Sequence, residues 1–296
     1  MSSNTQSRLH RPICPAAIQA FSFFSLSSLI FVISLFSGSI LGYTSELWAL
    51  TYWGPALYFC LLNFILRYFL KGFSYDVAVR AAFLGAVFAT GLYLTKFEDS
   101  WRAFGLYIMV LSIFHFSEFM AVALTNPKTL TIDSFILNHS VQYWVAAVAS
   151  WIEMAVESYF FPKLKMSPWV SLFGFTMCIG GEFLRKMAMF TAKTNFNHHV
   201  QTVKKPDHQL VTHGVYAYCR HPSYVGWFYW SIGTQIILIN PICVLVYTLV
   251  SWSFFQERIF AEEMFLISFF GNQYLVYQKQ VGTGIPFIMG YTPEEG

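Results

Sequence analysis

Residues 208–230 read His-Gln-Leu-Val-Thr-His-Gly-Val-Tyr-Ala-Tyr-Cys-Arg-His-Pro-Ser-Tyr-Val-Gly-Trp-Phe-Tyr-Trp. The first part of this stretch is rich in histidine, tyrosine and glycine, and the part that follows the proline is strongly hydrophobic. A polar, hydrogen-bonding loop that opens directly into an apolar helix is typical of a membrane enzyme. Such a junction brings a water-soluble cofactor on one side close to a lipid-like substrate on the other.

The composition of the whole chain indicates an integral membrane protein. Of its 296 residues, 56% are hydrophobic and only 11% are charged, whereas soluble domains carry about 25% charged residues. A charge at the centre of a bilayer costs roughly 2.5–3.5 kcal/mol, which explains the deficit. Aromatic residues reach 20%, and we attribute them mainly to lipid-facing surface and interfacial belts.

Apolar runs of about 20 residues, the length that crosses a bilayer, occur eight times. The predicted spans are residues 17–42, 47–70, 77–96, 102–124, 136–160, 168–191, 222–240 and 242–262. Because Asn240 and Pro241 alone separate the last two, residues 222–262 are expected to form a tight helical hairpin. We therefore expect an all-α integral membrane protein of about eight transmembrane helices, with a cofactor-binding loop and a C-terminal region.

An even number of spans places both termini on the same side of the membrane. That side carries 14 of the 18 Lys and Arg residues, and the opposite side carries 4. The positive-inside rule then predicts that the termini and the 192–221 loop face the cytosol. We divide the chain into residues 1–191, with about six spans, and residues 192–296, with the loop, the hairpin and the C-terminal segment.

Five histidines lie close together in the sequence, but their spacing does not fit a metal site. No two of them fall at i, i+4 on one helical face, and no carboxylate pair lies near them. We expect neither a metal nor a nucleic-acid partner, because the chain also lacks a Lys/Arg block that would neutralise a run of phosphates. The five are His198, His199, His208, His213 and His221.

Polar residues at two places are candidates for ligand binding. His221-Pro222-Ser223 predicts the start of a helix, whose free N–H groups suit a carboxylate or a hydroxyl-rich ligand. Arg258 and Glu262 follow at i, i+4 where the last span ends. A surface salt bridge there would contribute only about 0.3–0.5 kcal/mol, but ionisable residues at such a depth usually have a function. We interpret the arginine as a ligand for a substrate carboxylate and the glutamate as a ligand for an ammonium or ribose group.

Several segments, in this order, resemble the isoprenylcysteine carboxyl methyltransferase family. The Arg-His-Pro-x-Tyr-x-Gly segment at 220–226 alone is weak evidence, since membrane sterol reductases carry a similar one, but the ordered combination is specific. One departure is Val281-Gly282, where many relatives have proline after the valine. The matching segments are 208–211, 214–216, 220–226, Asn240-Pro241, the Arg258/Glu262 spacing, and Phe269-Phe270-Gly271 followed by Tyr274 and Tyr277.

The resemblance implies an S-adenosylmethionine-dependent enzyme that methylates the C-terminal carboxylate of S-prenylcysteine on CaaX-processed proteins. The products would be a methyl ester and S-adenosylhomocysteine. It also implies an endoplasmic reticulum membrane location, with the active site facing the cytosol. The expected partners are membrane lipids and prenylated proteins such as small GTPases and lamins, and residues 192–296 would form the methyltransferase core.

The family pattern assigns roles residue by residue. Arg258 matches the arginine assigned to the substrate carboxylate, and Arg258 and Glu262 are the expected catalytic pair. A carboxylate with a pKa near 3.5 is already ionised at neutral pH, so the reaction needs no general base. The residues expected to bind the donor are Gln201, His208, Gln209, Leu210, Val211, Tyr216, His221, Pro222, Ser223, Tyr224 and Glu262.

Two other functions compete with this interpretation. A membrane sterol or steroid reductase that uses NADPH would need basic residues for the 2′-phosphate, and Lys204-Lys205 would supply them. A transporter or lipid-binding protein would show broken helices in two repeat halves. We find no such internal symmetry in the sequence.

Overall fold

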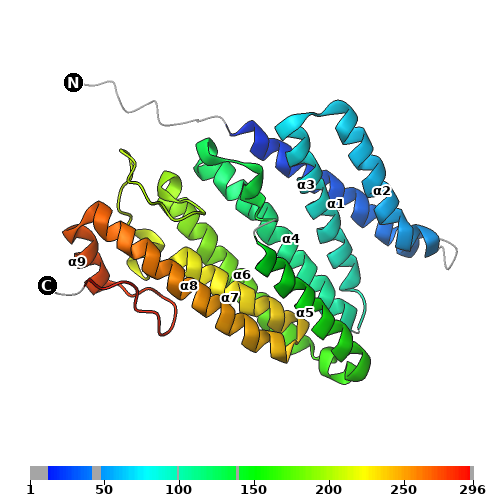
Figure 1. The fold of residues 1–296 in the computed structure, drawn as a ribbon. Helices are drawn as coiled ribbons and strands as arrows, with labels where there is room; N and C mark the ends of the chain where they lie inside the picture. The colour runs from blue at the N-terminus through cyan, green and yellow to red at the C-terminus, as the bar shows by residue number, and fades with distance from the viewer. Residues whose placement is uncertain (1–12, 42–47, 99, 138–139, 294–296) are drawn as a thin grey trace.

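Long helices make up nearly all of the structure, a computed structural model that describes residues 13–41, 48–98, 100–137 and 140–293. Figure 1 shows the long helices side by side, with the short helix α9 at one end. The α-helices are α1 (Pro15–Leu41), α2 (Trp48–Phe69), α3 (Gly72–Leu94), α4 (Ser100–Thr125), α5 (Val141–Phe160), α6 (Pro168–Ala192), α7 (Pro222–Leu238), α8 (Pro241–Phe270) and α9 (Asn272–Gln280). Short 3₁₀ helices are η1 (Pro127–Thr129), η2 (Ile132–Phe135), η3 (Pro162–Met166), η4 (Lys193–Asn195) and η5 (Gly214–Ala217).

Each of the eight predicted ranges overlaps one long helix, α1 to α8, so the prediction of an all-helical protein is confirmed. Among the described residues, three helices are long and apolar enough to cross a membrane: α1 over Pro15–Ile33, α3 and α4. The crossing of the other five stays a prediction. The helix α8 runs to Phe270, beyond the span end predicted at 262, and its last two turns help to build the site described below.

Small residues let neighbouring helices approach closely. A Cβ atom added to Gly85 of α3 would lie 2.3 Å from the carbonyl oxygen of Phe24 in α1. The same holds between α6 and α7, where a Cβ on Gly226 would lie 2.4 Å from the carbonyl oxygen of Gly181. Glycine at these positions brings the helix backbones into contact, so α7 is fixed directly against α6.

The turn between α7 and α8 is as short as predicted, and the charged side chains of Lys165 and Glu153 hold it. The side chain of Lys165 is buried and donates to two carbonyl oxygens at the C-terminal end of α7, at 3.0 and 2.8 Å, and to Oδ1 of Asn240 at 2.8 Å. The Glu153 carboxylate accepts from two backbone N–H groups in the first turn of α8, both at 2.7 Å. A cation at a helix C-terminus and an anion at an N-terminus both oppose the helix dipoles, which stabilises the hairpin.

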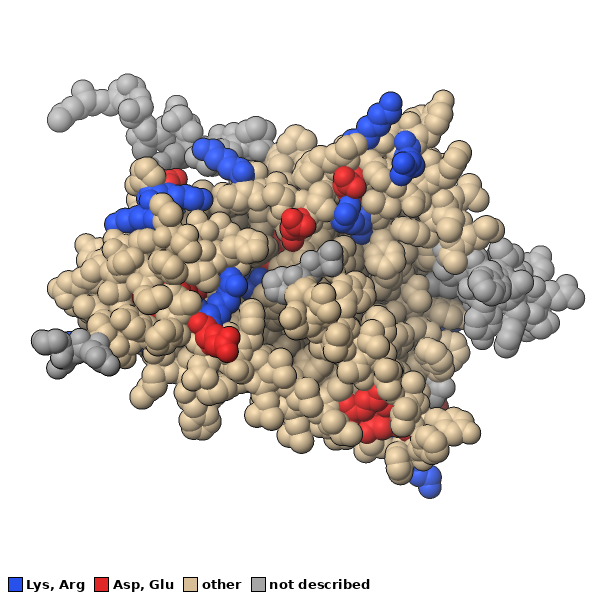
Figure 2. Space-filling view, viewed as in Figure 1, with Lys and Arg blue, Asp and Glu red and all other residues tan. Residues whose placement is uncertain are grey.

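The connection between α6 and α7 lies at the end of the bundle where α8 meets α9 and where α4 is linked to α5 (Figure 1). The α7–α8 turn lies at the opposite end. Figure 2 shows that charged side chains gather towards the two ends of this face, with a broad band free of charge between them. Such a band is what a protein surrounded by lipid presents.

Candidate active site

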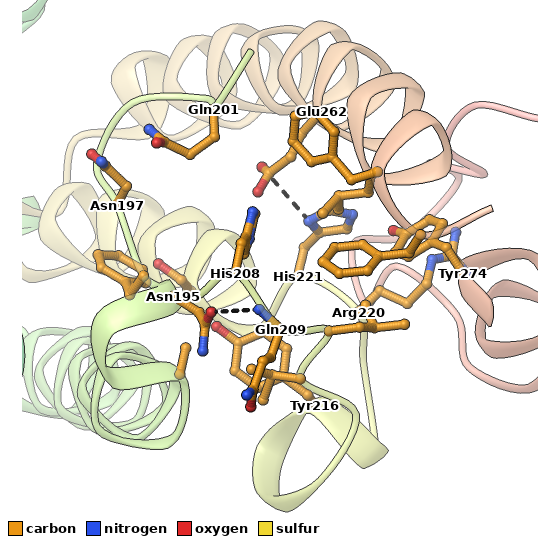
Figure 3. Close-up of a pocket in the computed structure, with 18 of the residues that line it drawn as sticks. Asn195, Asn197, Gln201, His208, Gln209, Tyr216, Arg220, His221, Glu262 and Tyr274 are labelled. Atoms are coloured by element: carbon orange, nitrogen blue, oxygen red, sulfur yellow. Dashed lines mark hydrogen bonds and ion pairs between the residues drawn. The ribbon is translucent and has the colours of Figure 1, made fainter. Parts of the chain in front are cut away.

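A cavity, here called the first cavity, opens between the 193–221 connection, the start of α7, the last turns of α8 and α9 (Figure 3). All eleven residues predicted to bind the donor line it. The fold therefore brings Glu262 of α8 to the same site as the loop residues Gln201 and His208. Lining residues that the prediction did not include are Ala192, Asn195, Phe196, Asn197, His199, Arg220, Leu266, Phe269, Phe270, Tyr274 and Tyr277.

Polar groups form one wall of the first cavity. The Glu262 carboxylate accepts a hydrogen bond from the Tyr224 hydroxyl and lies 4.0 Å from Nδ1 of His221. The rings of His221 and Tyr224 are stacked, with centroids 5.6 Å apart. Across the cavity, the Asn195 side chain accepts from the backbone N–H of Gln209 at 2.9 Å and fixes the loop (Figure 3).

Glu263, the neighbour of Glu262, has a different role. The sequence analysis assigned it none. Its side chain is fully buried, and its two oxygens accept from five donors. Adjacent residues on a helix point about 100° apart, so one carboxylate borders the cavity and the other fastens the C-terminal segment to α7. The five donors are Arg220 Nε at 2.7 Å, His221 Nε2 at 3.0 Å, the Tyr274 hydroxyl at 3.0 Å, Gln278 Nε2 at 3.0 Å and the Tyr291 backbone N–H at 2.9 Å.

Aromatic rings form another wall around His208. The imidazole meets the edges of Phe269 and Phe270, with ring centroids 5.8 and 5.3 Å apart. Partial burial, together with the positive charges of Lys204 and Lys205, lowers the pKa of His208 below its ordinary value. The imidazole is therefore neutral at pH 7 and adds no charge to the first cavity.

The first cavity also exposes backbone groups without partners. Within the described residues, the backbone of Leu210 and of Val211 makes no hydrogen bond, although both residues are partly buried. Such groups need water or a ligand as a partner. Together with the aromatic wall, they fit a ligand that combines a flat base with several polar groups, as the predicted donor does. Among the described residues, no three His, Cys, Asp or Glu side chains gather as metal ligands would.

A second cavity of about 630 Å³ lies between α4, η2, the end of α6, α7 and α8. Arg258 lines this cavity and does not line the first. Its Nε donates to the Tyr224 hydroxyl at 3.0 Å and its Nη2 donates to the carbonyl oxygen of His198. Its Nη1 has no hydrogen-bond partner within the described part of the chain, so one donor of the guanidinium is free for an anion.

Tyr224 separates the two cavities and lines both of them. Its hydroxyl donates to Glu262 and accepts from Arg258. The i, i+4 pair Arg258 and Glu262, considered above as a surface salt bridge, forms no direct ion pair among the described residues. The two side chains are joined through Tyr224, and each faces a different cavity.

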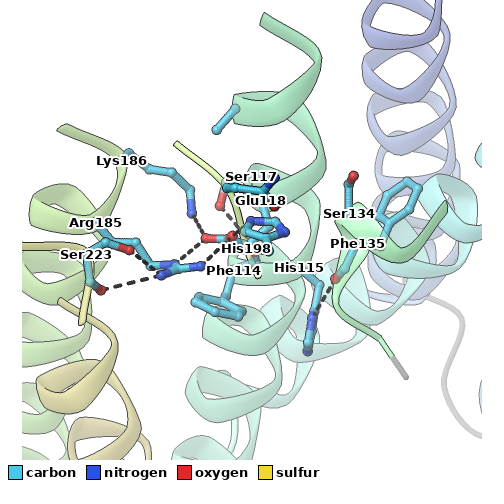
Figure 4. A network of polar contacts seen from close by, with 12 residues as sticks. Phe114, His115, Ser117, Glu118, Ser134, Phe135, Arg185, Lys186, His198 and Ser223 are labelled. Carbon is cyan, nitrogen blue, oxygen red and sulfur yellow. Dashed lines mark hydrogen bonds and ion pairs between the residues drawn. The ribbon is translucent and has the colours of Figure 1, made fainter. Parts of the chain in front are cut away.

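A cluster of buried charges lies beside both cavities, and the sequence analysis missed it (Figure 4). Glu118 of α4 is fully buried and contacts Arg185 and Lys186 of α6 and His198 of the following connection. Arg185 and Lys186 lie inside α6 with side chains 2% and 14% exposed. Charged residues within two predicted spans, 102–124 and 168–191, were the signal that would have revealed this cluster.

Comparison with known proteins identifies the family. A sequence model of the isoprenylcysteine carboxyl methyltransferase family matches residues 173–268. A protein-S-isoprenylcysteine O-methyltransferase of Tribolium castaneum is 58% identical over 229 residues, which cover 77% of this chain and 82% of that protein. The protein of the same name from Homo sapiens is 54% identical over 237 residues, which cover 80% of this chain and 84% of that protein. The chain belongs to the isoprenylcysteine carboxyl methyltransferase family.

A solved structure of the same family has the same fold. It is described as the eukaryotic intramembrane Ras methyltransferase ICMT, and it superposes with a TM-score of 0.91 at 51% identity, over 94% of this chain and 100% of the other. The chain is therefore a membrane methyltransferase. The segment matched by the family model runs from α6 to the end of α8, so it contains Tyr224, Arg258 and Glu262.

The family assignment does not favour the reductase interpretation, and the structure gives a reason. Lys204, which a reductase would need for a phosphate, donates to the carbonyl oxygen of Phe269 at 2.6 Å. Its ammonium also lies 4.7 Å from the centroid of the Phe270 ring. The lysine thus contacts the end of α8 directly.

Proposed function

We propose that this protein methylates the C-terminal carboxylate of S-prenylcysteine on processed proteins. S-adenosylmethionine is the donor, and the products are a methyl ester and S-adenosylhomocysteine. The observation that supports this most strongly is the pair of cavities that meet at Tyr224. One is lined by every residue of the family's donor pattern, and the other presents an arginine with a free N–H donor.

The first cavity is the donor site in this proposal. Glu262, 29% exposed, is placed to bind the ammonium or ribose group. The neutral His208 and the rings of Phe269 and Phe270 suit the adenine base, and the free backbone groups of Leu210 and Val211 suit its polar edge. When bound, S-adenosylmethionine supplies a methyl group that is already activated on sulfur.

The second cavity is the acceptor site. Arg258 binds the prenylcysteine carboxylate through its free Nη1, because a hydrogen bond between a guanidinium and a carboxylate is strengthened by their opposite charges. The acceptor carboxylate is ionised at neutral pH, so the protein supplies position and orientation, which account for roughly 7–11 kcal/mol of barrier in well-oriented reactions. Trp227, Phe254 and Phe255 line the same cavity and suit the start of the prenyl chain.

The membrane location of the site follows from its two substrates. The donor is polar and arrives from water, whereas a prenyl chain partitions into lipid. We place the protein in the endoplasmic reticulum membrane, with its termini and the first cavity facing the cytosol. Small GTPases and lamins, which carry prenyl groups, are the protein substrates that fit this arrangement, and membrane lipids surround the apolar band.

A methylation assay tests the proposal. The purified protein is given isotope-labelled S-adenosylmethionine and a small S-farnesylcysteine analogue, with the non-prenylated analogue as control. Labelled ester should form only on the prenylated compound. Absence of transfer to it, together with heat protection by NADPH in place of S-adenosylmethionine, would establish the reductase alternative.

A further inference from the structure

The buried carboxylate of Glu118 contacts groups that lead to both cavities. We propose that Glu118 is a positioning residue that holds the donor site and the acceptor site in place at the same time. This inference rests on the function proposed above, because it takes the first cavity as the donor site and Arg258 as the acceptor ligand. Glu118 itself lines neither cavity.

Both oxygens of Glu118 are engaged in charged contacts. Oε1 accepts from Arg185 Nε at 2.6 Å and from Lys186 Nζ. Oε2 accepts from Arg185 Nη2 at 2.8 Å and lies 3.0 Å from Nε2 of His198. The carboxylate and guanidinium therefore meet in a two-point arrangement, which fixes direction as well as distance.

One contact leads from Glu118 to the donor site. The Nη1 of Arg185, the one nitrogen that does not contact Glu118, donates to Ser223 Oγ at 2.6 Å. Ser223 lies in the first turn of α7 and lines the first cavity. The guanidinium also lies 4.7 Å from the centroid of a Trp227 ring. Glu118 thus orients Arg185, which in turn binds the first turn of α7.

A second contact leads to the acceptor site. The imidazole of His198 contacts Glu118, and the carbonyl oxygen of the same residue accepts from Arg258. His198 also lines the second cavity. The His198 imidazole lies against Glu118 without a hydrogen bond among the described residues, and Arg258 donates to the carbonyl oxygen of His198. A shift of His198 would therefore move the guanidinium that binds the substrate carboxylate.

The charges of the cluster support a role beyond packing. Glu118 and Glu182 balance Arg185 and Lys186, and Arg185 itself lines the second cavity. With Nε and Nη2 of Arg185 bonded to Glu118, this arginine does not compete with Arg258 for an incoming carboxylate. Removal of the Glu118 charge would release Arg185, which would then attract the substrate in a non-productive position.

Three substitutions test the proposal in the full-length protein, with two readouts. The readouts are the binding of S-adenosylhomocysteine by calorimetry and the KM for the S-farnesylcysteine analogue. Glu118→Gln should weaken S-adenosylhomocysteine binding by about tenfold and raise the KM for the analogue by about tenfold. Effects of this size are expected for a residue that acts through a packed network. His198→Ala should raise the KM for the analogue and leave S-adenosylhomocysteine binding unchanged.

Glu182→Gln is the matched control, because Glu182 belongs to the same cluster but contacts Lys186 and Ser117 and neither Arg185 nor His198. It should leave both readouts within about twofold of wild type. If Glu118→Gln and Glu182→Gln change the readouts equally, or if Glu118→Gln changes neither, Glu118 is merely structural and the proposal is wrong. If Glu118→Gln does not fold, His198→Ala becomes the deciding test, because the His198 side chain is 20% exposed and its removal should be tolerated. An unchanged KM for the analogue in His198→Ala then refutes the proposal. A wild-type protein that fails to methylate the analogue would instead refute the proposed function.

Discussion

Arg258 is the residue whose replacement best separates the two substrates. In Arg258→Ala, kcat/KM for the S-farnesylcysteine analogue should fall by about 100-fold or more, because the carboxylate loses its partner and its orientation. Binding of S-adenosylhomocysteine, measured by calorimetry, should persist, since Arg258 lies outside the first cavity. Glu257→Gln, an exposed change in the same helical turn, is the control. Near-normal turnover in Arg258→Ala would show that another group binds the carboxylate.

Glu262 should affect the donor. In Glu262→Gln the carboxylate charge is lost, and a hydrogen bond to a charged group contributes about 1.5–3 kcal/mol. Donor affinity should therefore fall by about tenfold or more, while the KM for the prenylated analogue changes little at saturating donor. Calorimetric titration with S-adenosylmethionine measures this, and an unchanged affinity would remove Glu262 from the donor site.

His208 gives donor binding a dependence on pH. Its pKa lies below 6.5, lowered first by burial and then by Lys204 and Lys205, so the ring is neutral at pH 7. S-adenosylmethionine carries a net positive charge, and its affinity should fall only as the pH drops through this lowered pKa. Lys205→Ala removes one positive neighbour, raises the pKa of His208 and should move the fall to higher pH. His208→Gln should abolish this component of the pH profile, and a profile unchanged by His208→Gln would contradict the assignment.

At the residue scale, the resemblance in sequence named donor-binding residues that share one cavity, but it did not reveal the buried charges. The donor residues lie close together in the chain around 208–224, with Gln201 and Glu262 added by the family pattern, and all of them line one cavity. Glu118 and Arg185 are 67 residues apart, and both lie within hydrophobic runs that were predicted as membrane spans. Which charges meet depends on the packing of α4 against α6, which no local pattern encodes.

At the scale of helices, the contact between α6 and α7 can be tested with two glycines. Gly226→Ala places a Cβ 2.4 Å from the carbonyl oxygen of Gly181, so α7 must move, at a cost of about 1–3 kcal/mol in the free energy of unfolding. Gly180→Ala, one residue before Gly181, meets nothing within 4 Å and should leave stability unchanged or slightly higher. The midpoint of thermal unfolding in detergent measures both. Equal midpoints for the two variants would show that close approach at Gly226 is not required.

The helices themselves were predictable from hydrophobic runs, but their ends were not. The helix α8 continues past residue 262 because 264–270 are apolar except for Ser268, and it ends where Gly271 adopts φ +55°. Before α5, the predicted span began at 136, whereas Ile136 ends η2 with φ +55° and the helix begins only at Val141. There Phe135 is fully buried and stacks on Phe119 with centroids 4.1 Å apart. A short apolar segment that packs on a neighbouring helix looks in the sequence like the start of a span.

At the scale of the whole molecule, the topology relative to the membrane is open to direct measurement. Val203, 73% exposed, lies in the 193–221 connection, and Lys163, also exposed, lies in η3 at the opposite end. On a background in which the exposed Cys60 is changed to serine, Val203→Cys should react with a membrane-impermeant maleimide in sealed microsomes. Lys163→Cys should react only after detergent is added. The reverse pattern would invert the orientation.

The position of Tyr224 has a thermodynamic consequence. One hydroxyl is bonded at once to the carboxylate of one cavity and to the guanidinium of the other, so a ligand that displaces it on one side alters the free energy of binding on the other. Thermodynamic linkage makes this effect mutual. If bound donor changes the affinity for the acceptor by some factor, bound acceptor changes the affinity for the donor by the same factor. The hydrogen bonds that couple the two sites are present before either substrate binds. The two substrates should therefore bind cooperatively.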